Sequence, residues 1–332
     1  MSLVWRDGRM IEDGSGADPI LAGWGVFTTV GCDDGRPLLW EQHRNRLIAS
    51  LGHLLPAVPV ELPDERDLGG LLDGAGLGGP AKLRVVVSRR SGAGAPSGTP
   101  PERENNEGEL ARQLHQLPAT DGDARRPSGR KPNRARRLAG LATEPGEICC
   151  HERVSGRDSW WEVEASAAPC DAVGPSIAPI RLAVERWQAF PPLGGHKTLA
   201  RLPWDLAHER AKSTGAGDVL LVDDLESVLE TAVANVWVLR GGEVRTPPAP
   251  ARCLPGVMRD WLMKRLPGLG LRVEDGDVDL AELARADEVW LSNAVVGVRR
   301  VADAAGRSWN RWPVFERLEG LGIPAPGWPS PS

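Results

Sequence analysis

Two stretches with the hydrophobic patterns of secondary structure flank a central stretch that lacks them. Short apolar runs and helical spacings occur in residues 1–90 and again in residues 177–332. The stretch from Ser91 to Ser176 is rich in Gly, Pro, Ala, Ser and Arg and has no long periodic run. We therefore expect an α/β (α+β) chain with a small N-terminal α/β domain at 1–90, a disordered low-complexity insertion at 91–176, and a large domain at 177–332.

The charge of the central stretch also argues against a packed core. Residues 125–137 contain seven basic side chains and no acidic one. This block favours solvated disorder over a nucleic-acid contact, because no aromatic side chain is interleaved to stack on bases. We expect no stable core between Ala95 and Ser176, at most a short helix near 107–117, and first proteolytic cleavage between Arg125 and Arg137.

The composition is that of an ordinary globular protein, with 41% hydrophobic residues, 26% charged residues and a net charge of -5. This mild charge gives no indication of a nucleic-acid partner. No window approaches the roughly 20 apolar residues of a membrane span, and the first residues lack the pattern of a signal peptide. We expect a cytoplasmic protein with no membrane contact.

The cysteines and glycines do not form the motifs of a metal or dinucleotide site. Cys149, Cys150 and Cys170, with His151, lack the second ligand pair of a structural zinc site, so we predict no metal and free thiols. Gly23 and Gly25 lack the third glycine and the following helix of a dinucleotide fingerprint.

Local patterns predict the main elements around these segments. Apolar spacing predicts a helix at 40–54, and β-branched runs predict strands at 24–31 and 82–88. In the C-terminal part we expect strands at 180–187, 219–222, 228–239 and 288–292, and helices at 203–213 and 256–266.

Lys197 is one of five lysines among 40 basic residues. A chain that otherwise uses arginine retains at this position an amine, which can lose its proton and attack a carbonyl group. Glu230 follows in an apolar strand, where an unpaired carboxylate is costly. The two residues predict a site that needs a nucleophilic amine and a paired carboxylate. The alternatives are a surface lysine and a carboxylate that faces water.

Four blocks of sequence resemble one enzyme family. They are residues 23–29 (GWGVFTT), residues 41–47 (EQHRNRL), residues 197–202 with 229–237 (KTLARL and LETAVANVW), and residues 246–259 with 291–298. In this order and spacing they resemble the class IV pyridoxal-phosphate enzymes, most closely those that act as 4-amino-4-deoxychorismate lyases. The resemblance implies a two-domain fold type IV, with a β-barrel-like sheet and flanking helices in the large domain, and a homodimer that binds pyridoxal 5'-phosphate.

The resemblance also implies a role for each matching residue. Lys197 would bond to the cofactor aldehyde and act as general acid and base, and Glu230 would pair with the pyridine nitrogen. The phosphate would be bound by the Arg46 side chain, by the amides of Val257 and Met258, and by Asn293 and Ala294. Weaker candidates for substrate contacts are Thr28 and Arg201, and the resemblance makes His43 a packing residue.

The implied reaction releases pyruvate from 4-amino-4-deoxychorismate and leaves 4-aminobenzoate, a folate precursor. The residues at 27–29 and 293–294 favour this lyase, as does the complete lack of tyrosine, which the related transaminases use around the cofactor. The alternatives are a class IV aminotransferase for branched-chain or D-amino acids, and a catalytically impaired or partly misfolded homologue.

Overall fold

The computed structural model describes residues 3–6, 9–12, 25–54, 60–89, 152–154, 161–171 and 174–329. These residues belong to one compact unit of the chain, Met1–Ser91 with Ala142–Ser332. Most of the central stretch lies outside the described residues. This includes Cys149, Cys150, His151, the expected helix near 107–117 and the arginines of 125–137.

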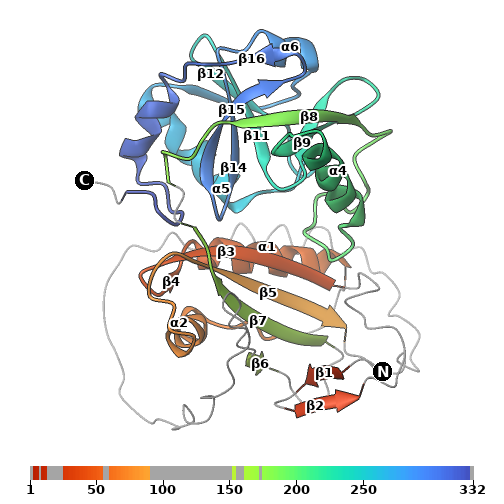
Figure 1. The fold of residues 1–332 in the computed structure, drawn as a ribbon, viewed down its shortest axis with the longest axis vertical. Helices are drawn as coiled ribbons and strands as arrows, with labels where there is room; N and C mark the ends of the chain where they lie inside the picture. Colours follow the sequence, from red (N-terminus) through yellow and green to blue (C-terminus); the bar gives the residue numbers. More distant parts are fainter. Residues whose placement is uncertain are drawn as a thin grey trace, which may run out of the picture. The chain divides into compact units, whose positions relative to one another are not determined.

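The smaller of the two main sheets has five antiparallel strands in the order β4-β3-β5-β7-β6 (Figure 1). Their bounds are β3 Gly25–Asp33, β4 Arg36–Pro37, β5 Ala81–Arg89, β6 Glu152–Val154 and β7 Trp161–Pro169. A separate two-stranded ladder pairs β1 (Leu3–Arg6) with β2 (Arg9–Glu12).

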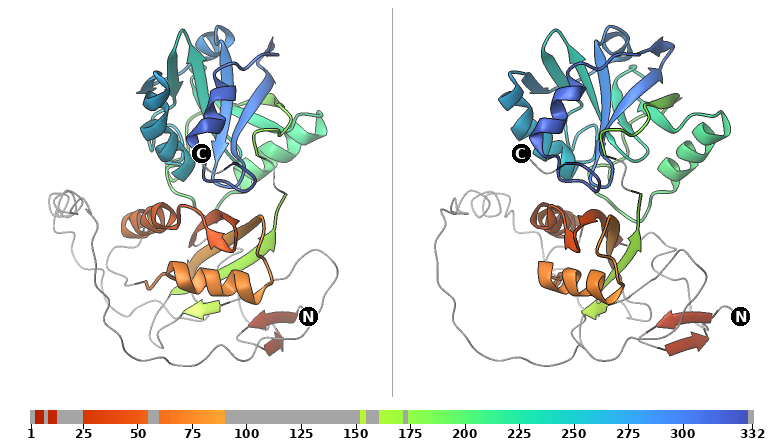
Figure 2. Two further views of the ribbon diagram at one scale, coloured as in Figure 1. Left: turned by 90° about the vertical axis from the view of Figure 1, so that its left-hand side faces the viewer. Right: turned by 60° about the vertical axis from the view of Figure 1, so that its left-hand side comes forward.

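Two helices pack on one face of this sheet, α1 (Trp40–Leu54) and α2 (Glu65–Gly74) (Figure 2). The shared core contains Val26 and Val30 of β3, together with Leu47 of α1 and Leu72 of α2. Because successive side chains of a strand point to opposite faces, Phe27 lies on the face away from this core. The alternation of β3 thus presents one set of side chains to the helices and the other to the opposite side.

Helix α2 was not predicted from the sequence, although its N-terminus has a clear signal. The Asp64 carboxylate accepts from the amides of Arg66 and Asp67, both at 2.8 Å, and Asp67 accepts in return from the Asp64 amide at 2.9 Å. This reciprocal capping box satisfies helix-end amides that would otherwise lack partners.

The expectation of no packed element between 91 and 176 is wrong at β7. This strand pairs with β5 over its full length, from Ala81↔Pro169 to Arg89↔Trp161. Its buried positions are Val163, Ala165 and Ala167, which alternate with polar residues. Alanines contribute little to a hydrophobic pattern, and this is why local periodicity missed a strand that tertiary pairing stabilises.

The larger sheet has nine strands in the order β10-β9-β8-β15-β14-β11-β12-β13, with β16 paired to β15. Pairing is parallel for β8 with β9, β8 with β15, and β12 with β13, and antiparallel elsewhere. The bounds are β8 Ile180–Arg186, β9 Asp218–Val222, β10 Val228–Thr231, β11 Asn235–Arg240, β12 Glu243–Thr246, β13 Arg272–Asp275, β14 Glu288–Asn293, β15 Gly297–Ala304 and β16 Arg307–Ser308.

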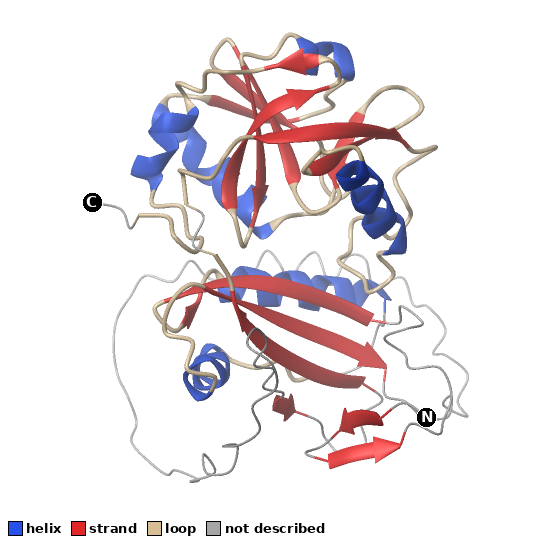
Figure 3. Cartoon of the chain, in the orientation of Figure 1, coloured by secondary structure: helices blue, strands red, loops and turns tan. Residues whose placement is uncertain are grey.

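Helices lie at the margins of the larger sheet (Figure 3). They are α4 Leu202–Ser213, α5 Val257–Arg265, α6 Leu280–Ala284, and the 3₁₀ helices η1 Leu266–Leu269 and η2 Phe315–Leu321. Helix α4 packs on β9 and β10, whereas α5, η1 and η2 enclose a core around Trp237 and Trp290. Among the described helices, none is long and apolar enough to cross a membrane.

The sequence predicted one continuous strand region at 228–239, but the structure divides it. Strand β10 ends at Thr231 and β11 begins at Asn235. Thr231 closes the turn between them, because its hydroxyl accepts from the Ala234 amide at 2.9 Å. This turn matters for the site below. The two-sheet architecture confirms the predicted mixed α/β fold class.

Candidate active site

A cavity of about 260 Å³ brings together segments that are far apart in the sequence. It is lined by β3, α1, the segment around Lys197, the β10–β11 turn, the start of α5 and the loop after β14. The predicted site residues among its lining are Arg46, Lys197, Arg201, Glu230, Val257, Met258, Asn293 and Ala294. Of the predicted site residues, Thr28 alone does not line this cavity.

The Lys197 segment is held by backbone pairing with β3. The Phe27 amide donates to the Lys197 carbonyl at 2.8 Å, and the Leu199 amide donates to the Gly25 carbonyl at 2.9 Å. A side chain at Gly25 would collide with the Val87 carbonyl oxygen, so this close approach requires glycine. The pairing fixes Lys197 beside the face of β3 that bears Phe27.

The surroundings of Lys197 favour its neutral amine. Its Nζ lies 4.8 Å from the centroid of the Phe27 ring. Burial lowers the pKa of Lys197 well below its ordinary value, the positive charges of Arg201 and Arg46 lower it further, and Glu230 opposes the shift. A neutral amine retains the lone pair that a nucleophile or a general base requires.

Glu230 is a buried carboxylate with two protein donors. It lies on β10 with 6% of its surface exposed. The indole N–H of Trp204 donates to Oε1 at 2.9 Å, and the Leu254 amide donates to Oε2 at 3.0 Å. Burial raises the pKa of Glu230, and both hydrogen bonds oppose that shift by favouring the ionised form.

Arg46 has an incompletely satisfied guanidinium. Its Nη2 donates to the Thr28 hydroxyl at 2.7 Å and its Nη1 to the Pro255 carbonyl at 3.4 Å, while its buried Nε has no partner among the described residues. Burial lowers its pKa to about 10, and Asp260 opposes this shift. Such a cation has room for an anionic ligand.

The N-terminus of α5 is directed at the same cavity. Gly256 is the N-cap, and Val257 and Met258 form the first turn. The first amides of a helix have no partner within it, and together with the helix dipole they form an anion-binding site. A side chain at Gly256 would collide with the Asn235 Oδ1 atom, so the sequence needs glycine here.

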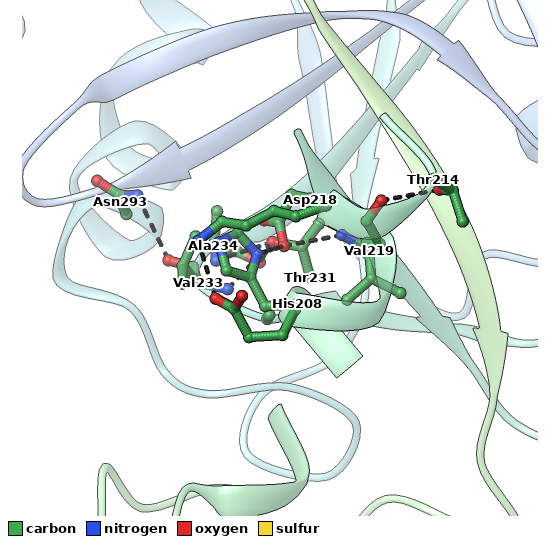
Figure 4. A network of polar contacts seen from close by, with 12 residues as sticks. His208, Thr214, Asp218, Val219, Thr231, Val233, Ala234 and Asn293 are labelled. Carbon is green, nitrogen blue, oxygen red and sulfur yellow. Dashed lines mark hydrogen bonds and ion pairs between the residues drawn. The ribbon is translucent and has the colours of Figure 1, made fainter. Parts of the chain in front are cut away.

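The loop after β14 is organised by Asn293, whose contact with Val233 is drawn in Figure 4. Its Oδ1 accepts from the amides of Val295 and Val296 at 3.0 and 2.8 Å, and its Nδ2 donates to the Val233 carbonyl at 3.4 Å. The Asn293 side chain is therefore used to shape this loop and to hold it against the β10–β11 turn. Asn293, Ala294 and Val295 of this loop line the cavity and are within reach of a ligand.

The two weaker candidates for substrate contacts have different positions. Arg201 lines the cavity, and its guanidinium donates to the Ala232 carbonyl. Thr28 is fully buried on the opposite face of β3, where its hydroxyl contacts Arg46 and lies 2.6 Å from His43 Nδ1. Strand alternation thus makes Thr28 a support for Arg46, and the expected substrate contact by its side chain is wrong.

Sequence reasoning missed three residues that shape this site. Trp204, in the first turn of α4, holds Glu230, and Asn235 donates to the Leu254 carbonyl at 2.8 Å. Arg84 of β5 lies 4.3 Å from the Phe27 ring centroid. A buried indole N–H usually requires an acceptor, so Trp204 offered a usable signal, whereas the position of Arg84 depended on strand register.

The arrangement fits a cofactor with an aldehyde, a phosphate and a ring nitrogen. Lys197 supplies an amine with a lowered pKa, Arg46 and the α5 N-terminus offer hydrogen-bond donors for an anion, and Glu230 supplies a buried carboxylate. The buried Arg46 Nε, which has no partner among the described residues, is the feature that most directly fits an anionic group.

The model of the class IV aminotransferase family matches residues 155–304. A curated aminodeoxychorismate lyase from Vibrio harveyi is 33% identical over 112 residues, which cover 34% of this chain and 41% of the relative. Branched-chain-amino-acid aminotransferase 6 from Arabidopsis thaliana is 36% identical over 93 residues, covering 27% and 26%. The chain thus aligns with less than half the length of these curated relatives.

Solved structures match over nearly the whole chain. The 4-amino-4-deoxychorismate lyase of Pseudomonas aeruginosa is 26% identical with a TM-score of 0.62, and the match covers 95% of this chain and 96% of the lyase. A hypothetical aminotransferase from Mycobacterium tuberculosis in its PLP-bound form shares the fold at 19% identity, a TM-score of 0.63 and 95% coverage of both chains. The fold is that of the fold type IV pyridoxal-phosphate enzymes, and residues 155–304 match the class IV aminotransferase family.

Proposed function

We propose that this protein converts 4-amino-4-deoxychorismate to 4-aminobenzoate and pyruvate, with Lys197 as the catalytic residue. The observation that supports this most is the union of Lys197, Glu230 and the Arg46 anion site around one cavity. The Pseudomonas aeruginosa lyase, at 26% identity, is more similar to this chain in sequence than the matching aminotransferase structures at 16–21%, and this supports the lyase activity. We further propose a cytoplasmic homodimer that contributes to folate precursor synthesis.

The proposed roles follow from the surroundings of each group. When bound, pyridoxal phosphate withdraws electrons from the substrate carbon that bears the amine. Arg46, the amides of Val257 and Met258, and the loop at 293–294 hold its phosphate. Glu230 keeps the ring nitrogen protonated, since a carboxylate beside that nitrogen stabilises the proton.

Lys197 moves the protons of the reaction. Its amine, whose pKa is lowered by burial and neighbouring arginines, takes the proton from the ring carbon that bears the substrate amine. The bond between the ring and the enolpyruvyl oxygen then breaks, the ring becomes aromatic, and the departing enolpyruvate gains a proton to become pyruvate. Aromatisation makes the products much more stable than the substrate.

Two arginines beside the cavity suit a substrate with two carboxylates. Arg201 lines the cavity, and Arg84 lies over Phe27, whose ring also lines it. We propose that these guanidinium groups bind the ring and enolpyruvyl carboxylates, since arginine matches a carboxylate with two parallel donors. This proposal gives Arg201 the substrate role that the sequence indicated.

An aminotransferase is the second candidate, because relatives at similar identity have that activity. The two activities share the early proton transfer at Lys197 and differ in the fate of the substrate. The lack of tyrosine in the whole chain favours the lyase over the transaminases that resemble it.

The deciding experiment measures both activities on one preparation. Pyruvate release from 4-amino-4-deoxychorismate is expected, whereas amino transfer from branched-chain or D-amino acids to 2-oxoglutarate should be far slower. The reverse ranking would establish the aminotransferase. Bound cofactor absorbance with neither activity would identify a catalytically impaired homologue, and Lys197→Ala is the inactive control.

A further inference from the structure

The first turn of α4 connects the predicted catalytic lysine to the buried carboxylate. Residues 197–204 run from Lys197 to Trp204 without interruption, and two side chains near the end of this segment contact the Glu230 region. Arg201 donates to the Ala232 carbonyl, and Trp204 donates to Glu230 Oε1 at 2.9 Å. The spacing between the lysine and the carboxylate is therefore set by a short segment of chain.

We propose that Trp204 is a positioning residue that keeps Glu230 ionised and directed toward the cofactor ring. The proposal rests on the proposed role of Glu230. A buried carboxylate in a poorly solvated site tends to take up a proton, and a protonated Glu230 could not stabilise a proton on the ring nitrogen. An indole N–H, which can only donate, selects the ionised acceptor.

The packing around Trp204 leaves its indole little freedom. Trp204 is 6% exposed, its ring contacts Trp187 edge to face with centroids 5.1 Å apart, and the Arg201 guanidinium lies 5.2 Å above it. The Leu254 amide holds the second carboxylate oxygen at 3.0 Å. Each oxygen of Glu230 thus has one fixed donor and retains capacity for a further one on the cavity side.

The charged groups that face Glu230 act in the same direction as Trp204. Arg201 and Lys197 both favour its ionised form, and burial opposes it. Lys197 loses its positive charge when it gives up its proton, whereas the Trp204 donor stays in place. We therefore expect the Trp204 hydrogen bond to be needed most when the amine is neutral.

The chain provides a matched control in Trp187. Its ring packs against Trp204, but its own indole N–H donates to Glu185 at 3.0 Å and not to Glu230. Trp187→Phe should therefore remove aromatic packing without removing the donor to Glu230. A change in stability that Trp204→Phe shows and Trp187→Phe does not is therefore due to loss of the hydrogen bond from Trp204 to Glu230.

The sign of the pH effect follows from burial. Because the folded pKa of Glu230 is raised, ionised Glu230 destabilises the folded chain as pH rises above the unfolded value of about 4.3. Loss of the Trp204 donor increases that cost. Below about pH 4, where Glu230 is protonated, Trp204→Phe loses no hydrogen bond to an ionised Glu230, and Trp187→Phe loses its packing and its own bond to Glu185.

The first measurement is denaturant unfolding of the full chain, freed of cofactor, from pH 4 to pH 8. Relative to Trp187→Phe, the unfolding constant of Trp204→Phe should rise by an additional factor of about 10 to 100 across this range, the value of a hydrogen bond to a charged group. In a Glu230→Gln background this pH-dependent factor should disappear. An equal pH dependence for both tryptophan variants would overturn the proposal.

The second measurement needs no tryptophan variant and applies even if Trp204→Phe does not fold. Of the 13 tryptophans, one indole N–H resonance should titrate together with Glu230 and stop titrating in Glu230→Gln. The proposal is wrong if every indole resonance that shifts with pH in the wild type also shifts with pH in Glu230→Gln. Neither measurement depends on turnover. If the protein lacked lyase activity, the proposed function would be refuted, and these measurements would still test the role of Trp204.

Discussion

Lys197 lies where its amine can lose a proton more readily than an exposed lysine. Borohydride reduces the bond between a lysine amine and the cofactor aldehyde, and we expect Lys197→Ala to abolish this reducible bond. Among the described residues that line the cavity, no other side chain carries an amine. Mass spectrometry of the reduced, digested protein should find the cofactor on Lys197 in the wild type. Trapping on Lys212 or Lys264 would show that a different lysine reacts.

Burial of the Lys197 amine also predicts how stability changes with pH. The folded pKa is lowered, so the protonated amine destabilises the folded chain at low pH, and the cost disappears as pH rises to about 10.4. In the cofactor-free protein, Lys197→Met should therefore raise the free energy of unfolding by about 1 kcal/mol or more near pH 6. Urea titrations should show this gain shrinking toward pH 10, and a constant gain would exclude the lowered pKa as its cause.

Thr28 illustrates how strand alternation changes the role of a residue. Its hydroxyl accepts from Arg46 at 2.7 Å, so Thr28→Val should leave the guanidinium less well oriented toward a phosphate. We expect a loss of cofactor affinity of about 1 kcal/mol, against about 1.5 to 3 kcal/mol for Arg46→Ala. Equilibrium binding of pyridoxal phosphate measures both.

Thr246→Val is the control for Thr28→Val. The Thr246 hydroxyl is also fully buried, has no partner among the described residues, and does not line the cavity. Its removal should leave cofactor affinity unchanged. Equal affinity losses in the two variants would mean that Thr28 acts through general packing and not through Arg46.

At the scale of elements, the N-terminus of α5 depends on the absence of a side chain at Gly256. An alanine there would meet the Asn235 side chain, which itself is bonded to the Leu254 carbonyl. We expect Gly256→Ala to displace the first turn of α5 and to lower affinity for pyridoxal phosphate about tenfold, since a helix N-terminus binds anions only when its amides are aligned.

Gly268 provides the comparison, because a Cβ at that position would meet nothing within 4 Å. Gly268→Ala should leave cofactor binding unchanged in the same titration. If Gly256→Ala binds the cofactor as tightly as Gly268→Ala, the α5 N-terminus does not form the phosphate site.

At the scale of the whole molecule, the smaller sheet joins strands from both sides of the central stretch of the sequence. Strand β5 precedes this stretch and β7 follows it, yet they pair along their full length. The Lys197 segment also pairs with β3. The predicted first cleavage by trypsin between Arg125 and Arg137 should therefore leave two fragments that remain associated.

Such a nicked protein should retain its cofactor and its activity, because backbone pairing and the shared core hold both fragments. Gel filtration followed by denaturing electrophoresis would show one native peak containing two fragments. Resistance of residues 125–137 to trypsin, comparable to that around Lys197, would contradict the predicted disorder of this segment.

Local sequence determined the elements whose patterns are strong over a short range. Helix α1 has the predicted bounds of 40–54, β5 extends one residue beyond the prediction at each end, and α4 begins one residue earlier than predicted. Lys197 and Glu230 stand out in the sequence because an amine among arginines and a carboxylate in an apolar strand are unusual. Backbone periodicity and the cost of burying charge act within a few residues, so they can be read from sequence.

Tertiary structure alone decided which side chains meet. Strand β7 has too few large apolar residues to be recognised without β5, and only the packing of α1 against β3 shows that Thr28 supports Arg46. The Trp204 hydrogen bond to Glu230 joins residues of two elements, and so does the contact of Arg84 with Phe27. These contacts depend on strand register and helix packing between distant segments, which local periodicity does not determine.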